Sequence, residues 1–224
     1  MNTINKNLQN ISKVPVTASV GFAALVVALL PGLGELLQYD RAAIAGGEVW
    51  RLASCYLVHW SADHLCWDWL MFVVLGAVCE MRNPWRMRSC LVAGIAAVSA
   101  VVYWGFPAIE VYRGLSGLDS ALFTLLATDL FNEARREGDK LWLFLTGGLL
   151  AAFGAKTIYE AITGQAFFVD QQAAKFVTLV FDHVAGAVVG VVISLVSVDL
   201  VCKSGLRVGI EISEKNVRVV QTLP

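Results

Sequence analysis

The chain has 224 residues, of which 57% are hydrophobic and only 16% are charged, and its mean hydropathy is +0.65. Soluble globular domains carry about a quarter charged residues, so this composition excludes that class and indicates a membrane protein. The formal net charge of −1 gives no sign of a nucleic-acid partner, and we expect none. The five cysteines lack paired metal-type spacing, so we expect no metal and no cofactor. We interpret the cysteines as small core residues, with a Cys55–Cys66 disulfide as a minor alternative.

Six apolar windows are long enough to cross a bilayer, because about 30 Å of hydrocarbon requires roughly 20 residues of helix. In chain order they cover residues 16–37, 64–81, 88–106, 115–132, 141–162 and 176–201. The first is too long, and too well supported by the later ones, to be a cleaved signal peptide. We therefore predict an all-α membrane protein built as a six-transmembrane-helix bundle. Its predicted parts are an N-terminal segment, a membrane domain and a C-terminal tail: residues 1–15, 16–201 and 202–224.

The lysines and arginines of the polar joints predict an orientation, because short cytoplasmic loops are enriched in them. With a cytoplasmic N-terminus, the basic residues on cytoplasmic segments are Lys6, Lys13, Arg82, Arg86, Arg88, Arg135, Arg136, Lys140, Lys203, Arg207, Lys215 and Arg218. The outer joints then hold only Arg41, Arg51, Arg113 and Lys175, with Lys156 inside the fifth window. We therefore expect both termini to be cytoplasmic and the lipid bilayer to surround the bundle. In this orientation Ser116, His64 and His183 all lie towards the outer surface.

The second window is interrupted by His64 and Asp68 within "HLCWDWL". These two residues are four apart, so they share one helix face and can bond each other inside the bundle. Ionisable residues inside a membrane segment are costly and often mark a functional site. The alternative is a structural histidine that bonds a backbone carbonyl.

The fourth window opens on "YRGLSGLDSALF", in which Ser116 stands between Gly114 and Gly117. A serine at this place is most often a helix N-cap. It can also be a nucleophile, because the first N–H groups of the helix are free to bind an oxyanion, with His64 as a side-chain donor. The glycines leave room for a substrate backbone. Asp119, one turn later, is expected to be structural, either bonding a neighbouring helix or staying protonated.

The sixth window contains "DHVAGAVVG", in which His183, Gly186 and Gly190 lie on one helix face. Two glycines four residues apart let a neighbouring helix approach closely, and the helix that begins at Ser116 is the natural candidate. A serine hydroxyl needs a base to take its proton, so Ser116 and His183 are a candidate catalytic pair. Helix packing alone also explains such glycines.

These motifs together resemble the rhomboid family of intramembrane serine proteases, over residues 47 to 195. "GLSG" is similar to the G-x-S-G nucleophile motif of that family, and "HVAGAVVG" is similar to its H-x-x-G-x-x-x-G base motif. The resemblance implies a Ser116–His183 dyad without a third acidic member. It also implies membrane-anchored proteins as substrates, cleaved in or near their transmembrane segments.

The stretch "HWSADHLCWDWL" resembles the histidine, histidine, asparagine pattern of the family at His59, His64 and Asp68. The resemblance implies that side chains at the last two positions help the serine backbone to hold the oxyanion. Aspartate is a departure, because an asparagine amide donates a hydrogen bond and an ionised carboxylate cannot. Asp68 is therefore expected to be protonated, or to orient His64 instead.

A narrower resemblance is to the rhombosortases, a bacterial branch of the rhomboids. It rests on "VYRGLSGLDSALF" and on "AKTIYEAITGQ", which carries Lys156, Glu160 and Gly164. The branch typically has histidine and glycine where this chain has Ser120 and Ala121. The resemblance implies a multi-pass protein of the bacterial inner (plasma) membrane. Its implied substrates are secreted proteins with a C-terminal glycine-rich motif, an apolar helix and a basic end.

Two other classes of function stay open on the sequence. A non-catalytic rhomboid-like membrane protein would bind transmembrane clients without cutting them, and the departure at Asp68 favours it. A small transporter or channel would use Asp68, Asp119 and Asp129 as a relay inside the membrane. The sequence does not indicate the oligomeric state.

Overall fold

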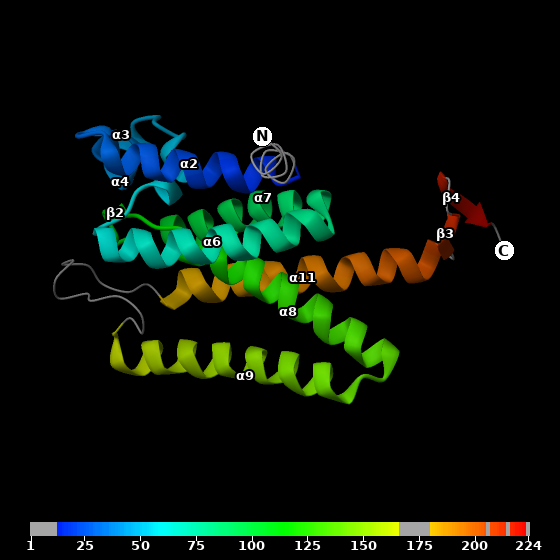
Figure 1. Ribbon diagram of the computed structural model, residues 1–224. Coiled ribbons are helices and arrows are strands. Elements are labelled where there is room, and N and C mark those ends of the chain that lie inside the picture. The colour runs from blue at the N-terminus through cyan, green and yellow to red at the C-terminus, as the bar shows by residue number, and fades with distance from the viewer. Residues whose placement is uncertain (1–12, 166–179, 205–206, 214–215, 223–224) are drawn as a thin grey trace.

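The computed structural model describes residues 13–165, 180–204, 207–213 and 216–222. Six long helices make up most of this part (Figure 1): α2 Pro15–Leu29, α6 Ala62–Arg82, α7 Pro84–Ala100, α8 Ser116–Glu137, α9 Lys140–Thr163 and α11 Val180–Ser204. Each of them overlaps one of the six predicted windows. The start of the sixth window and three basic residues used for the orientation lie outside the described residues, namely 176–179, Lys6, Lys175 and Lys215.

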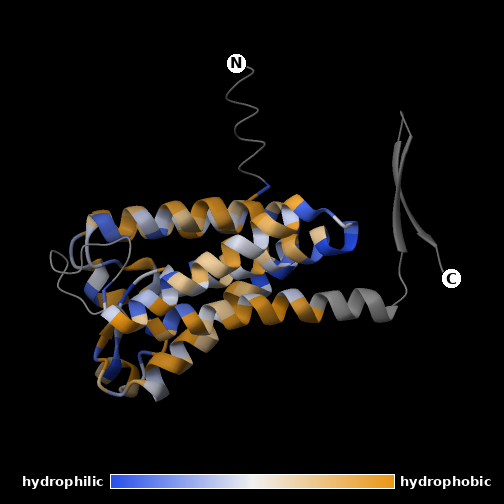
Figure 2. Ribbon diagram, turned by 90° about the horizontal axis from the view of Figure 1, so that it is seen from below, coloured by the Kyte–Doolittle hydropathy of each residue, from blue (hydrophilic) through white to orange (hydrophobic). Residues whose placement is uncertain are grey.

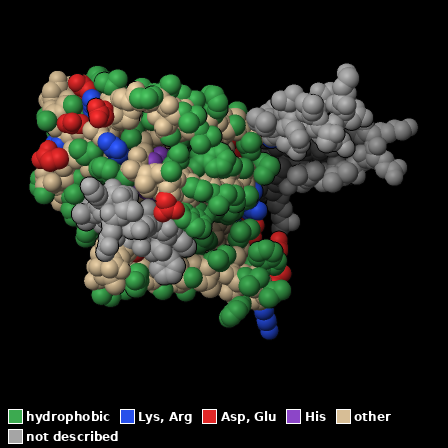
Figure 3. All heavy atoms as spheres, turned by 60° about the vertical axis from the view of Figure 1, so that its left-hand side comes forward, with side chains coloured by type: hydrophobic (Ala, Val, Ile, Leu, Met, Phe, Trp, Pro, Cys, Tyr) green, Lys and Arg blue, Asp and Glu red, His purple; other side chains and the backbone are tan. Residues whose placement is uncertain are grey.

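Three helices of the described chain are long and apolar enough to cross a membrane: Ala62–Arg82, Pro84–Gly105 and Lys140–Thr163. The second of these includes a π-helical turn, Val101–Gly105, that continues α7. In Figure 2 the helices are largely hydrophobic along their lengths, and hydrophilic residues gather near their ends. In Figure 3 most of the visible flank is hydrophobic, and charged side chains gather mainly towards the ends. Such an exterior suits a helical protein surrounded by lipid.

The first predicted window, 16–37, is wrong as a single helix. Helix α2 ends at Leu29, and a short helix, α3, begins only at Leu33. The break falls on Pro31 and Gly32, because proline lacks an N–H for the helix and Gly32 adopts a left-handed φ of 80°. The chain therefore turns before it reaches the loops that lie beside the candidate site.

A two-stranded antiparallel sheet ties this early segment to the chain just before Ser116. Strand β1, Tyr39–Asp40, pairs with β2, Val111–Tyr112, so that Tyr39 faces Tyr112. Three short helices follow β1 along the chain: α4 Arg41–Ala45, α5 Arg51–Ser54 and the 3-10 helix η1 Cys55–Leu57. The Gly114 N–H donates to the carbonyl of Cys55 at 3.3 Å, so this layer also fixes the approach to α8.

The centre of the bundle is the contact between α8 and α11, which is more extensive than any other between described elements. It is a contact of backbone on backbone. A Cβ atom added to Gly186 would lie 1.9 Å from the carbonyl oxygen of Gly117, and one added to Gly190 would lie 2.1 Å from that of Ala121. Only glycine at these two positions allows the helices to approach this closely.

Helix α2 is anchored by a buried carboxylate from another helix. Glu80 of α6 accepts hydrogen bonds from the N–H groups of Val16 and Thr17 at 3.0 and 2.9 Å, and from the Thr17 hydroxyl at 2.8 Å. The N-cap residue Val14 makes no side-chain cap. Glu80 therefore satisfies N–H groups that the helix itself cannot, and its charge suits the helix N-terminus.

At the C-terminus α11 continues to Ser204, beyond the predicted end of the membrane domain at residue 201. Strands β3, Arg207–Ser213, and β4, Asn216–Thr222, then form an antiparallel hairpin. The minor alternative of a Cys55–Cys66 disulfide is wrong, because both residues are free cysteines. Cys55 is buried in η1, whereas Cys66 is exposed on α6.

Candidate active site

Ser116 is the first residue of α8, and the N-cap position belongs to Leu115. The Ser116 hydroxyl does not cap the helix. It donates instead to Oδ2 of Asp182, at the start of α11, over a long 3.4 Å. The N–H groups of Ser116 and Gly117 have no hydrogen-bond acceptor among the described residues, as expected at the start of a helix. They are available to bind a developing oxyanion.

Gly114 brings the chain to Ser116 in a conformation that other residues rarely adopt. Its φ is 121°, in the left-handed region. A Cβ atom here would lie 2.9 Å from Cε1 of His64 and 3.1 Å from Oδ2 of Asp68. The loop before α8 therefore runs directly over the histidine and aspartate of α6.

Asp68 acts as an acceptor in this structure. Its Oδ2 accepts the Leu115 N–H at 2.9 Å and lies 3.1 Å from Nε2 of His64 and 3.5 Å from Nε2 of His59. The Trp60 N–H approaches the other ring nitrogen of His64, Nδ1, at 3.4 Å. The 3.1 Å contact is one that a role in orienting His64 requires, and both expected roles of Asp68 stay predictions. The same carboxylate holds the peptide immediately before Ser116.

Asp182 connects the two residues predicted to act together. Its Oδ2 accepts the Tyr112 hydroxyl at 2.8 Å as well as the Ser116 hydroxyl, and its Oδ1 lies 3.6 Å from Nε2 of His183. Ser116 and His183 thus lie on either side of one buried carboxylate. Among the described residues, no hydrogen bond joins Ser116 directly to His183.

The other side of the His183 ring faces helix α9. Nδ1 of His183 lies 3.2 Å from Oε2 of Glu160, and Nζ of Lys156 lies 2.9 Å from the same oxygen. The sequence predicted a dyad without an acidic partner, yet the structure brings Glu160 to the imidazole. The available signal was an acid and a lysine four residues apart inside an otherwise apolar window.

Asp119 is buried one turn below Ser116. Its Oδ1 has no hydrogen-bond partner among the described residues. This oxygen therefore makes no bond that would support the expectation that Asp119 bonds a neighbouring helix. The other expectation, a protonated structural side chain, stays a prediction.

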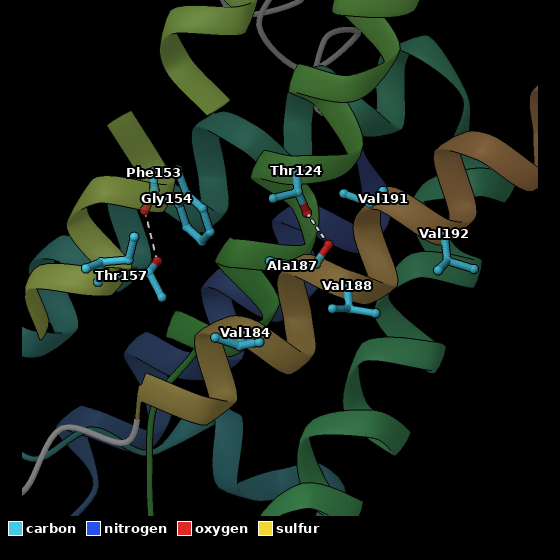
Figure 4. A pocket seen from close by; sticks show the side chains of 10 residues that line it. Thr124, Phe153, Gly154, Thr157, Val184, Ala187, Val188, Val191 and Val192 are labelled. Atoms are coloured by element: carbon cyan, nitrogen blue, oxygen red, sulfur yellow. Dashed lines mark hydrogen bonds between the residues drawn. The ribbon is translucent and has the colours of Figure 1, made fainter. Parts of the chain in front are cut away.

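An apolar cleft of about 480 Å³ begins beside His183 and follows α11 away from it. Figure 4 shows its walls, which come from α8, α9 and α11. The lining residues are Thr124, Phe153, Gly154, Thr157, Ile158, Val184, Ala187, Val188, Val191 and Val192. The Thr124 hydroxyl donates to the Ala187 carbonyl at 2.9 Å, so little polarity is left facing the cleft. Its chemistry suits a hydrocarbon chain or an apolar helix.

The fold and the site define a helical membrane protein with a half-buried serine, a buried histidine and several buried acids at one end of the bundle. A family model described as the Rhomboid domain matches residues 46–199. A search of curated proteins found no match. The chain belongs to the rhomboid family, whose members are usually intramembrane serine proteases, and it is an integral membrane protein.

Proposed function

We propose that the protein is an intramembrane serine endopeptidase that cleaves membrane-anchored proteins in or near their transmembrane segments. Ser116 is the nucleophile and His183 is the base. The observation that carries this proposal is the glycine contact between α8 and α11, which brings both residues to the same carboxylate, Asp182. Family membership supports the reaction class.

The proposed reaction begins when the Ser116 hydroxyl leaves Asp182 and turns towards Nε2 of His183. The Oγ atom attacks the carbonyl carbon of the substrate while its proton passes to Nε2. The resulting oxyanion is stabilised by the N–H groups of Ser116 and Gly117. Collapse of the intermediate breaks the C–N bond, and His183 returns the proton to the leaving amine. Water then hydrolyses the acyl-enzyme by the same steps in reverse.

His64 and Asp68 have a supporting role in this proposal. The structure directs the Nε2 side of His64 at Asp68, and Asp68 holds the Leu115 peptide. Both therefore fix the direction in which the first N–H groups of α8 point. Gly114 shares this supporting role, because no side chain fits between its backbone and the side chains of His64 and Asp68.

We also propose six membrane spans with both termini in the cytoplasm. Supporting this, the basic residues of the α6–α7 and α8–α9 turns lie at the far end of α8 from Ser116. Arg82 there bonds Glu133, and Arg86 bonds Asp129 at 2.8 Å. With these turns in the cytoplasm, Ser116 faces the outer leaflet.

A role in C-terminal sorting-signal processing at the bacterial inner membrane is the narrower proposal. Two residues of the rhombosortase-like stretch, Lys156 and Glu160, lie at the candidate base, which supports a link between that stretch and the reaction. A panel of membrane-anchored reporters tests it. Reporters with a glycine-rich motif before a C-terminal apolar helix and basic end should be cut at least as fast as reporters lacking that motif.

The deciding experiment is Ser116→Ala, with His183→Ala beside it, against a co-expressed membrane reporter. Cleavage should fall to background in both variants at unchanged protein levels. Labelling by a fluorophosphonate should likewise require both residues. Persisting cleavage by Ser116→Ala would exclude Ser116 as the nucleophile.

A further inference from the structure

One buried glutamate of α9 lies against the candidate base, on the side of the ring that faces away from Asp182. Glu160 is 1% exposed, and it is one of two buried residues on α9, the other being Thr146. A helix that buries so little would be expected to use an apolar residue at its contact with the core. Glu160 instead brings a carboxylate to Nδ1 of His183 at 3.2 Å.

The donors and acceptors at this contact restrict where the proton of the imidazole lies. An ionised carboxylate can only accept, so a hydrogen bond between Glu160 and His183 requires the proton on Nδ1. A neutral imidazole with its proton on Nδ1 has a bare Nε2. Nε2 is the nitrogen on the side of Asp182 and Ser116, where the proposed reaction needs an acceptor.

Lys156 offsets the free-energy cost of burying the Glu160 carboxylate. Its Nζ lies 2.9 Å from the Glu160 oxygen that faces His183, and its side chain is 21% exposed while that of Glu160 is 2% exposed. An unpaired carboxylate among apolar helices is costly, and a partner four residues away offsets that cost. Nζ also lies 3.4 Å from Nδ1. With the proton on Nδ1, the ring nitrogen and the ammonium are both donors and cannot bond each other, so Glu160 accepts from both.

We propose that Glu160 is the positioning residue of His183. It holds the proton on Nδ1 and thereby keeps Nε2 free to accept the Ser116 proton, while Lys156 neutralises its charge. The inference rests on the proposed function, and it replaces the expected dyad with a serine, histidine and glutamate that act in sequence. Glu160 acts through His183 and touches no reacting atom, so its effect should appear in kcat and not in KM.

The test compares five proteins in detergent: wild type, Glu160→Gln, Glu160→Asp, Lys156→Met/Glu160→Gln and the control Glu80→Gln. Glu160→Gln should lower kcat by about tenfold to a hundredfold with KM unchanged, since an amide can donate to Nδ1 and favour the wrong ring proton. Fluorophosphonate labelling should slow by the same factor. Glu80→Gln replaces an equally buried glutamate that is bonded to α2, and kcat per labelled active site should not change.

The double variant distinguishes positioning of the His183 ring by Glu160 from the effect of leaving the Lys156 charge unpaired. If activity falls in Glu160→Gln only because the Lys156 ammonium is left unpaired beside the imidazole, then removing that ammonium should restore it. If Glu160 positions the ring, the double variant should stay impaired, and Glu160→Asp should recover part of the rate. Full activity in Glu160→Gln, or recovery in the double variant, would overturn the proposal.

The ring nitrogens of His183 report on the inference without any substrate. The chain has only three histidines, so ¹⁵N-labelled histidine gives a simple spectrum. With the imidazole neutral, His183 should carry its proton on Nδ1 in the wild type and lose this preference in the double variant. An unchanged proton position would overturn the inference. Absent cleavage and labelling in the wild type would overturn the proposed function alone.

Discussion

Glu80 and Glu160 are the same residue type, each 1% exposed, yet their partners differ in kind. Glu80 accepts from two backbone N–H groups and a threonine hydroxyl, none of which titrates. Glu160 accepts from a lysine and a histidine, both of which can change charge. The first set of partners fixes where a helix lies, and the second can govern where a proton lies. Burial of an acid therefore does not by itself indicate chemistry; the partner does.

The largest expected effect comes from Gly186→Ala, which disturbs the contact on which the role of Glu160 depends. The new Cβ atom would lie 1.9 Å from the Gly117 carbonyl oxygen, so α8 and α11 must separate. We expect a loss of about 3 kcal/mol of unfolding free energy and of nearly all cleavage. The matched control is Gly148→Ala on α9, where nothing lies within 4 Å of the added atom. Equal behaviour of the two variants in unfolding and cleavage assays would contradict the close contact.

The next largest effect tests the structural role of Glu80, which is to anchor helix α2. Glu80→Ala leaves the N–H groups of Val16 and Thr17 and a buried hydroxyl without their acceptor, which costs about 3 kcal/mol of unfolding free energy. Because Glu80 has no contact with His183, kcat of the folded fraction should stay at the wild-type value. Unfolding in detergent and active-site titration measure the two quantities separately. If Glu80→Ala lowers kcat and leaves the unfolding free energy unchanged, then Glu80 and Glu160 do not differ in role as proposed.

A smaller effect is expected when Glu160 loses its lysine. Lys156→Met removes the ammonium partner of the carboxylate, and the unfolding free energy should fall by about 1–2 kcal/mol. The chain offers a control in Arg82→Met, because Arg82 bonds Glu133 at an exposed turn, where a lost ion pair costs at most about 1 kcal/mol. If both variants lose the same stability, the Lys156–Glu160 pair behaves as an ordinary surface pair.

Apolar length and periodicity were enough to predict where five of the long helices lie, and the break after α2 was readable from Pro31 and Gly32. The contact of His64 with Asp68 was also readable from their spacing of four residues, but the partners that buried acids find on other helices were not. Glu160 meets a histidine 23 residues later, and Ser116 meets Asp182 across 66 residues. A sequence shows that an acid is in an apolar window, but which neighbour it faces depends on how the helices are rotated against each other. Asp68 illustrates the same limit, because its role as an acceptor follows from the Leu115 N–H.

The smallest expected effect concerns a third buried acid, Asp119, which extends the comparison. Glu80 and Glu160 both have partners, whereas Oδ1 of Asp119 has none among the described residues. Asp119→Asn keeps the shape and stands in for a protonated carboxyl, so most activity should remain and the unfolding free energy should change by less than about 1 kcal/mol. A loss as deep as that of Ser116→Ala in a folded protein would instead give Asp119 a part in the reaction. Asp119 would then have to form a contact during catalysis that the described residues do not show. It would join Glu160 as a second buried acid with a functional role.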